Sequence, residues 1–197
     1  MARKTQISKE IILESAFDML LKEGYAAINI TSLAKKIGCS TQPIAWQFGN
    51  METLRAELLT YCLEFLRDRF AVDETNVSGA LDDIALRYVE LAFDYPNLYK
   101  YLYMSDQDGD KMAVMAQTLR AENRDRLIQM LEKEHGITAE SAEIYLLNLQ
   151  LYVHGISTFA VTKVSFPSKE VVMKMIHDAR EAFLMQAKGG TNNDDIN

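Results

Sequence analysis

The 197-residue sequence has few of the residues that mark special protein classes: 2 Cys, 3 Pro and 9 Gly. So few cysteines exclude a disulfide scaffold, and so little proline and glycine exclude collagen-like and low-complexity chains. No run of about 18 apolar residues is present, because the closest candidate contains Asn148, Gln150 and His154. The first six residues, MARKTQ, lack the apolar core of a signal peptide. We therefore expect a globular cytoplasmic protein with no membrane partner.

The net charge of −7 is unevenly distributed along the chain. Residues 1–55 hold seven Lys and Arg against five Asp and Glu, whereas residues 56–197 hold the other 14 bases against 23 acids. This asymmetry favours a basic nucleic-acid-binding module joined to an acidic body.

Apolar residues three and four positions apart recur through most of the chain, and glycines separate the runs. This spacing is typical of amphipathic helices, so the sequence predicts an all-α fold. The expected early helices follow Ser8, cover 30–37 and 42–48, and run from Asn50 to about residue 70. Later helices are expected near 78–94, 97–105, 109–135, 138–163 and 168–187, before a polar tail over 188–197.

The first fifty residues have the layout of a helix-turn-helix DNA reader. Ala34 is small enough for two helices to cross there, and Gly38 can adopt the left-handed conformation that the turn needs. The helix that begins near Gln42 would then lay its N-terminal end along a major groove.

Three segments carry a family resemblance: Gly24-Tyr25, Leu33 to Ser40, and Ile44…Phe48…Asn50…Glu52-Thr53-Leu54. Over residues 8–58 the chain resembles the DNA-binding domain of the tetracycline-repressor (TetR) family. The resemblance implies a helix-turn-helix domain over 1–58, a helical effector-binding and dimerisation domain over 59–187, and a flexible tail over 188–197. It also implies base contacts from Thr41, Gln42, Pro43 and Trp46, and contacts to the DNA backbone from Thr31, Ser40 and Gln47.

Three positions depart from the family pattern. Ala45 stands where the family usually has Tyr, Gln47 where it has His or Tyr, and Met51 where it favours Lys. No Lys or Arg occurs from Ile37 to Leu54, so phosphate contacts must come from helix N-termini and from Arg3, Lys4, Lys35 and Lys36. The alternative for Trp46 is a packed core aromatic.

The segment from Ile144 to Thr162 contains no charged residue and is apolar on every face. Such a helix must be buried on more than one side, which favours a core face and a partner face. With the last helix it resembles the helix pair that forms dimers in this family. The expected dimer interface comprises Tyr145, Leu149, Tyr152, Ile156, Phe159, Met175 and Phe183. The alternative is one unusually central helix in a monomer.

Aromatic and methionine side chains gather in the sequence around Pro96 and just after it. Such linings suit apolar or aromatic small molecules. The candidate effector pocket consists of Phe93, Tyr99, Tyr103, Met112, Met115 and His154. The alternative is ordinary core, with His154 hydrogen-bonded inside it.

The residues that enzymes and metal proteins need are missing from the sequence. Glu132 and His135 form one Glu-x-x-His match, where a di-iron bundle needs two such motifs and two further Glu. No phosphate loop or nucleophile elbow is present. We therefore expect no enzyme activity, cofactor or metal. The sequence predicts a homodimeric, ligand-responsive transcriptional regulator that represses by binding operator DNA. The alternative is a helical ligand-binding or adaptor protein that has lost DNA binding.

Overall fold

The computed structural model describes residues 7–67, 77–105, 121–162 and 167–190, and every regular element in these ranges is helical. The predicted all-α class is confirmed. The chain divides into two compact units. We call residues 1–68 and 95–111 the head, and residues 69–94 and 112–197 the body. The head therefore extends beyond residue 58 and includes a segment from the middle of the chain.

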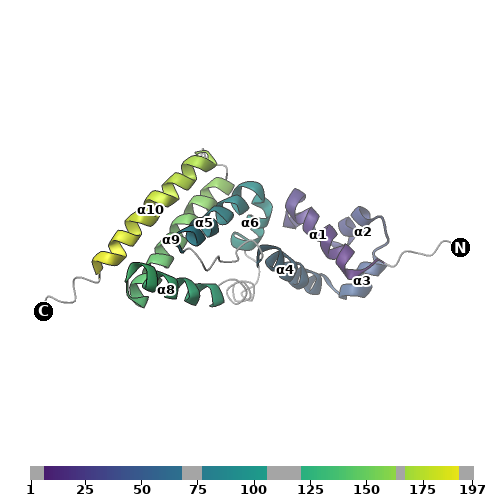
Figure 1. Ribbon diagram of the computed structural model, residues 1–197. Coiled ribbons are helices and arrows are strands. Elements are labelled where there is room, and N and C mark those ends of the chain that lie inside the picture. The colour runs from purple at the N-terminus through teal and green to yellow at the C-terminus, as the bar shows by residue number, and fades with distance from the viewer. Residues whose placement is uncertain (1–6, 68–76, 106–120, 163–166, 191–197) are drawn as a thin grey trace. The chain divides into compact units, whose positions relative to one another are not determined.

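The head contains five described α-helices and one short 3-10 helix (Figure 1). They are α1 (Lys9–Glu23), η1 (Tyr25–Ala27), α2 (Ile30–Ile37), α3 (Gln42–Phe48), α4 (Met51–Arg67) and α6 (Pro96–Tyr103). The predicted helices lie close to these bounds, whereas η1 was not predicted.

The core of the head is built around α1 and α4. Leu20 of α1 and Leu58 of α4 are fully buried, and the Phe17 ring lies 5.2 Å from the ring of Tyr61. Helix α6 joins this core, because the Asn97 side-chain amide donates to the Leu21 carbonyl at 3.0 Å. An aromatic stack between Tyr25 and Tyr101, with ring centroids 4.7 Å apart, holds α6 at a second point.

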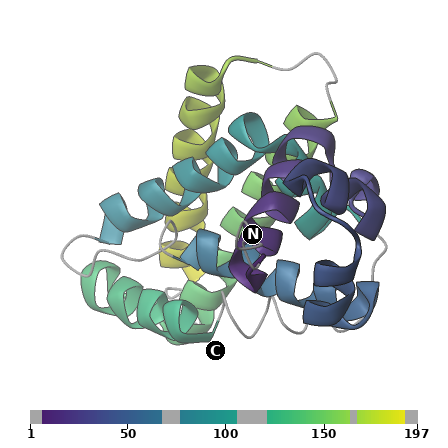
Figure 2. The ribbon, with the colours of Figure 1, turned by 90° about the vertical axis from the view of Figure 1, so that its right-hand side faces the viewer.

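The body contains four described helices: α5 (Val77–Asp94), α8 (Ala121–His135), α9 (Ala139–Val161) and α10 (Lys169–Gly190). Helices α5, α8 and α10 all pack against α9 (Figures 1 and 2). Ion pairs join α10 to α5, from Arg180 to Asp82 at 2.7 Å and from Lys169 to Glu90 at 2.8 Å. The helix predicted over 109–135 is described only from Ala121 onward.

Helix α9 supplies much of the core of the body, including Tyr145 and Val153. By length and composition alone, α9 is also long and apolar enough to cross a membrane. The central helix of a globular core meets the same test, and one face of α9 has that role here.

Candidate nucleic-acid interface

Helix α2 begins at a reciprocal cap. The Asn29 side-chain oxygen accepts from the Ser32 backbone N–H at 2.9 Å, and the Ser32 hydroxyl accepts from the Asn29 N–H at 3.0 Å. Two otherwise unsatisfied amides are thereby bonded, which fixes where the helix starts. Leu33 and Ala34 face inward, with 0% and 4% of their surfaces exposed.

The turn between α2 and α3 depends on Gly38. Its φ of +77° and ψ of 34° lie in the left-handed region, and its N–H donates to the Ala34 carbonyl at 3.0 Å. A Cβ built at Gly38 would meet no atom within 4 Å, so the backbone angle and not the available space favours glycine here. The predicted role of Gly38 is confirmed.

Helix α3 has one buried side and one open side. Ile44 and Phe48, four residues apart, are 0% and 4% exposed and fix α3 on the core of the head. Trp46 lies between them in sequence and is 75% exposed. The alternative that Trp46 is a packed core aromatic is therefore wrong.

Most of the predicted DNA-contacting residues are open to solvent. The exposed ones are Thr31, Lys35, Ser40, Thr41, Gln42 and Trp46. Pro43 and Gln47 are half-buried, and the Gln47 amide donates to the Ile7 carbonyl at 3.3 Å. Gln47 thus holds the start of α1 against α3, a contact that its sequence position did not reveal. The contacts of these eight residues with DNA remain a prediction.

Several lysines of the head are paired with acids of the same chain. Lys9 lies 2.6 Å from Glu57, and Asp18 binds both Lys22 and Lys36. Hydrogen bonds from the Lys22 and Lys36 ammonium groups hold the pKa of the Asp18 carboxyl below its usual value. Lys35 lies beside the turn and is exposed, as Lys22 and Lys36 also are.

The structure corrects part of the expected dimer interface. Tyr145, Leu149 and Ile156 are 2%, 6% and 8% exposed, so they belong to the core of the body and cannot offer a partner surface. Tyr152 and Phe183 are half-buried against that core, and their rings meet edge to face at 6.1 Å. Phe159 and Met175 are 57% and 38% exposed and remain candidates.

The outward face of α9 includes Phe159, which the sequence predicted at the interface, and three residues that were not predicted there. Ile144, Leu147 and Leu151 are 51%, 45% and 61% exposed and follow one another at helical spacing toward Phe159. The pattern could not separate the two faces, because apolar residues occur on both of them from Ile144 onward. These four residues, which we call the α9 face, form an apolar surface available to a partner.

The predicted effector pocket is not assembled in either compact unit. Tyr99 and Tyr103 belong to the head, where Tyr99 is fully buried and the two rings lie 4.9 Å apart. Phe93 and His154 belong to the body, where His154 Nδ1 lies 2.7 Å from the Tyr88 hydroxyl. Met112 and Met115 lie outside the described residues. The structure therefore supports the alternative interpretations for Tyr99, as core, and for His154, as a hydrogen-bonded histidine.

Comparison with known proteins supplies relatives for the whole chain. An HTH-type transcriptional regulator of Bacillus subtilis (strain 168), YobS, is 23% identical over 187 residues, covering 93% of this chain and 94% of the relative. No family model matches the sequence.

Solved structures of two regulators share the fold. A TetR variant from Acinetobacter baumannii AYE in complex with minocycline superposes with a TM-score of 0.58 at 16% identity, covering 91% of this chain and 96% of that one. The flavonoid-responsive regulator FrrA superposes with a TM-score of 0.59 at 19% identity, covering 90% and 95%.

These relatives are transcriptional regulators and not enzymes, and they extend over both the head and the body. The resemblance predicted from residues 8–58 is thereby confirmed along nearly the whole chain. The protein is similar to helix-turn-helix transcriptional regulators, and it has the fold of the TetR-type repressors.

Proposed function

We propose that the protein is a homodimeric, cytoplasmic transcriptional regulator that represses by binding operator DNA and is released by a small-molecule effector. The observation that carries this proposal is the open side of α3. Trp46 is 75% exposed there, and Thr41 and Gln42 lie exposed at the helix start. Core side chains anchor the opposite side, so α3 packs on the head with its polar and aromatic residues outward.

Gln42 has the chemistry for direct base recognition. A glutamine amide in the major groove makes a paired donor and acceptor contact with adenine, worth about 1–3 kcal/mol of discrimination. Trp46 offers apolar contact on the same helix. Phosphate contacts would come from Lys35, from Thr31 and Ser40, and from helix N-termini.

The α9 face supports the dimer. Apolar side chains grouped on one exposed helix face mark an interaction surface more often than isolated ones do. A two-fold dimer also suits helix-turn-helix heads, because two recognition helices then bind half-sites about one DNA turn, or a multiple of it, apart.

The effector is proposed to be apolar or aromatic and to bind the body. The relatives support this class, since one solved structure holds minocycline and the other is named as flavonoid-responsive. In the body, the Tyr88–His154 pair offers polar groups beside an apolar core. Ligand binding would favour one of two dimer arrangements, with a coupling of about 1–3 kcal/mol in typical cases.

The test of DNA recognition uses a duplex selected from randomised DNA by the purified protein, together with a scrambled duplex of the same composition. Gln42→Ala should weaken binding to the selected duplex by about 1–3 kcal/mol and leave the scrambled duplex nearly unchanged. Gln150→Ala, which removes an exposed glutamine from α9, is the matched control and should alter neither. Equal losses on both duplexes would contradict a base-reading role, and failure to enrich any sequence would favour the adaptor alternative.

A further inference from the structure

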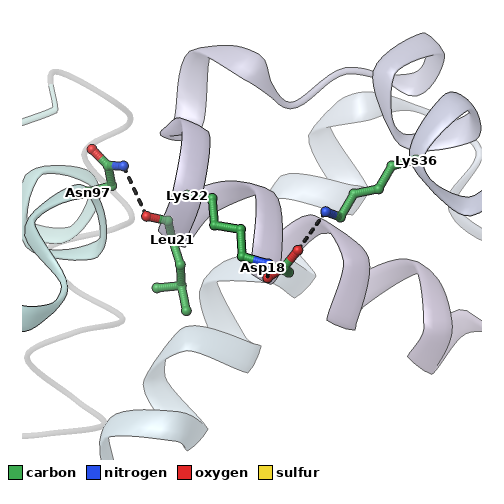
Figure 3. Close-up of polar contacts among 5 residues, drawn as sticks. All are labelled: Asp18, Leu21, Lys22, Lys36 and Asn97. Atoms are coloured by element: carbon green, nitrogen blue, oxygen red, sulfur yellow. Dashed lines mark hydrogen bonds and ion pairs between the residues drawn. The ribbon is translucent and has the colours of Figure 1, made fainter.

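Asp18 lies in the second half of α1 and faces two lysines from different places in the head (Figure 3). Its Oδ1 lies 2.7 Å from Lys22 Nζ, one turn further along α1, and its Oδ2 lies 2.5 Å from Lys36 Nζ on α2. The Lys36 side chain is 29% exposed, whereas that of Lys22 is 69% exposed. The contact between the helices is therefore the better enclosed of the two.

This pairing affects the charge of the helix-turn-helix itself. Lys36 stands in the last turn of α2, five residues before the α3 N-cap Thr41. The first helix of such a motif crosses the DNA backbone, so a lysine in α2 is placed near phosphates. In this chain that lysine is directed toward an acid on α1 and is partly neutralised by it (Figure 3).

Within residues 30–48, which span the helix-turn-helix, Lys35 is the only other cation that could replace Lys36. Lys9 is paired with Glu57, and no Lys or Arg occurs between Ile37 and Leu54. Lys35, the neighbour of Lys36, is exposed. The charge that α2 offers to DNA is therefore sensitive to a single carboxylate.

We propose that Asp18 is a positioning residue that holds Lys36 away from the DNA backbone and thereby limits sequence-independent DNA binding. This inference rests on the proposed DNA-binding function. Contacts to phosphates strengthen binding to every sequence and carry no base information. Withholding one such contact lowers the affinity for the many non-specific sites, while Gln42 and Trp46 remain available for recognition.

The test compares Asp18→Asn with the unmodified protein on a scrambled duplex at about 50 and about 200 mM salt. Asparagine keeps the size of the side chain but removes the charge that holds Lys36. If Lys36 then gains one phosphate contact, the slope of log affinity against log salt should steepen by about 0.9 for each bound head. The affinity ratio of variant to unmodified protein should accordingly grow about 3.5-fold per head between the higher and the lower salt.

Repeating the Asp18→Asn substitution in two other variants distinguishes the release of Lys36 from a general effect of the lost negative charge. In a Lys36→Met protein, Asp18→Asn should no longer steepen the salt dependence, whereas in a Lys22→Met protein it should still do so. Glu23→Gln removes an exposed acid from another side of α1 and should change the slope less than Asp18→Asn does. Circular dichroism and thermal melting show whether each variant is folded.

An unchanged slope for Asp18→Asn, in a protein that binds the scrambled duplex measurably, would overturn the inference and leave the proposed function intact. The same steepening in the Lys36→Met background would overturn it as well, because the effect would not pass through Lys36. If the unmodified protein binds neither a selected nor a scrambled duplex, the proposed function fails, and this inference fails with it.

Discussion

The head and the body differ in which apolar side chains they bury and which they leave exposed. In the head, α3 turns Ile44 and Phe48 inward and leaves one large apolar residue, Trp46, on its open side. In the body, α9 buries one face in the core and still exposes the four residues of the α9 face. The open side of α3 therefore carries a single large apolar residue, whereas α9 presents an apolar surface that suits a second protein.

The largest expected effect comes from placing a charge on the buried side of α9. Val153 is 5% exposed, so Val153→Asp would bury a carboxylate without a partner and should cost about 3–5 kcal/mol of the unfolding free energy. Urea unfolding followed by circular dichroism measures this loss. Val153→Ala, which removes volume but adds no charge, should cost less. A Val153→Asp protein as stable as the unmodified chain would show that this side of α9 is not core.

The same substitution on the outward side should have a different result. Leu151 is 61% exposed, so Leu151→Asp should leave the fold intact but weaken the dimer, because the charge would be buried only when a second copy covers it. Sedimentation velocity over a range of concentrations should show a monomer where the unmodified protein is a dimer. Gln150→Asp adds the same charge to an exposed position beside the face and should remain dimeric. A dimeric Leu151→Asp protein would place the interface elsewhere.

A buried tyrosine from each region allows the stability of the head and that of the body to be compared at alkaline pH. Burial raises the pKa of the Tyr101 hydroxyl in the head and of the Tyr145 hydroxyl in the body above the ordinary value of about 10. The stability that each neutral hydroxyl contributes is full below pH 10 and is lost as the pH rises toward the folded-state pKa, by up to about 1.4 kcal/mol per pH unit.

Tyr101→Phe and Tyr145→Phe should each flatten this alkaline loss. The unfolding free energies of each variant and of the unmodified protein are measured between pH 9 and 11. The slopes of unfolding free energy against pH are then compared, rather than the absolute free energies. Full alkaline sensitivity retained in the double variant would show that neither hydroxyl is responsible.

The smallest expected effects come from two helix caps, one in each region. Asn29 caps α2 in the head, and in the body the Thr138 hydroxyl accepts from the Ser141 N–H at 3.2 Å at the start of α9. Asn29→Ala and Thr138→Ala should each cost about 1 kcal/mol. Asn29→Asp keeps the acceptor and should cost less than Asn29→Ala. Thermal melting measures the losses, and a neutral Asn29→Ala variant would contradict the role of this cap.

The sequence predicted the head better than the body, and the reason is physical. Caps and turns depend on single residues, so Ser8, Asn50 and Gly38 indicated where helices begin and end. The inward side of α3 followed from Ile44 and Phe48, because residues four positions apart lie on the same face of a helix. In α9, Leu149 and Leu151 are chemically the same, and only the packing of α5, α8 and α10 shows that one is core and the other exposed.

The candidate contacts between distant segments were the least predictable. The aromatic residues around Pro96 suggested one pocket, yet the chain passes from body to head at Tyr95, so Phe93 and Tyr99 belong to different units. The pairing of Asp18 with Lys36 joins residues 18 positions apart, and no local pattern marks it. Such contacts follow from the fold and not from spacing along the sequence.

The central claim is that α3 binds DNA, and Trp46, the single tryptophan of the chain, allows a direct measurement. Titration of the purified protein with the selected duplex, following tryptophan emission at two salt concentrations, tests the claim without any label. Because Trp46 is 75% exposed, contact with DNA should change its emission in a saturable way. The account predicts that the change with the selected duplex persists at the higher salt, while the change with the scrambled duplex is lost. Unchanged emission with both duplexes, at concentrations where an independent assay shows binding, would contradict the account by placing the DNA away from α3.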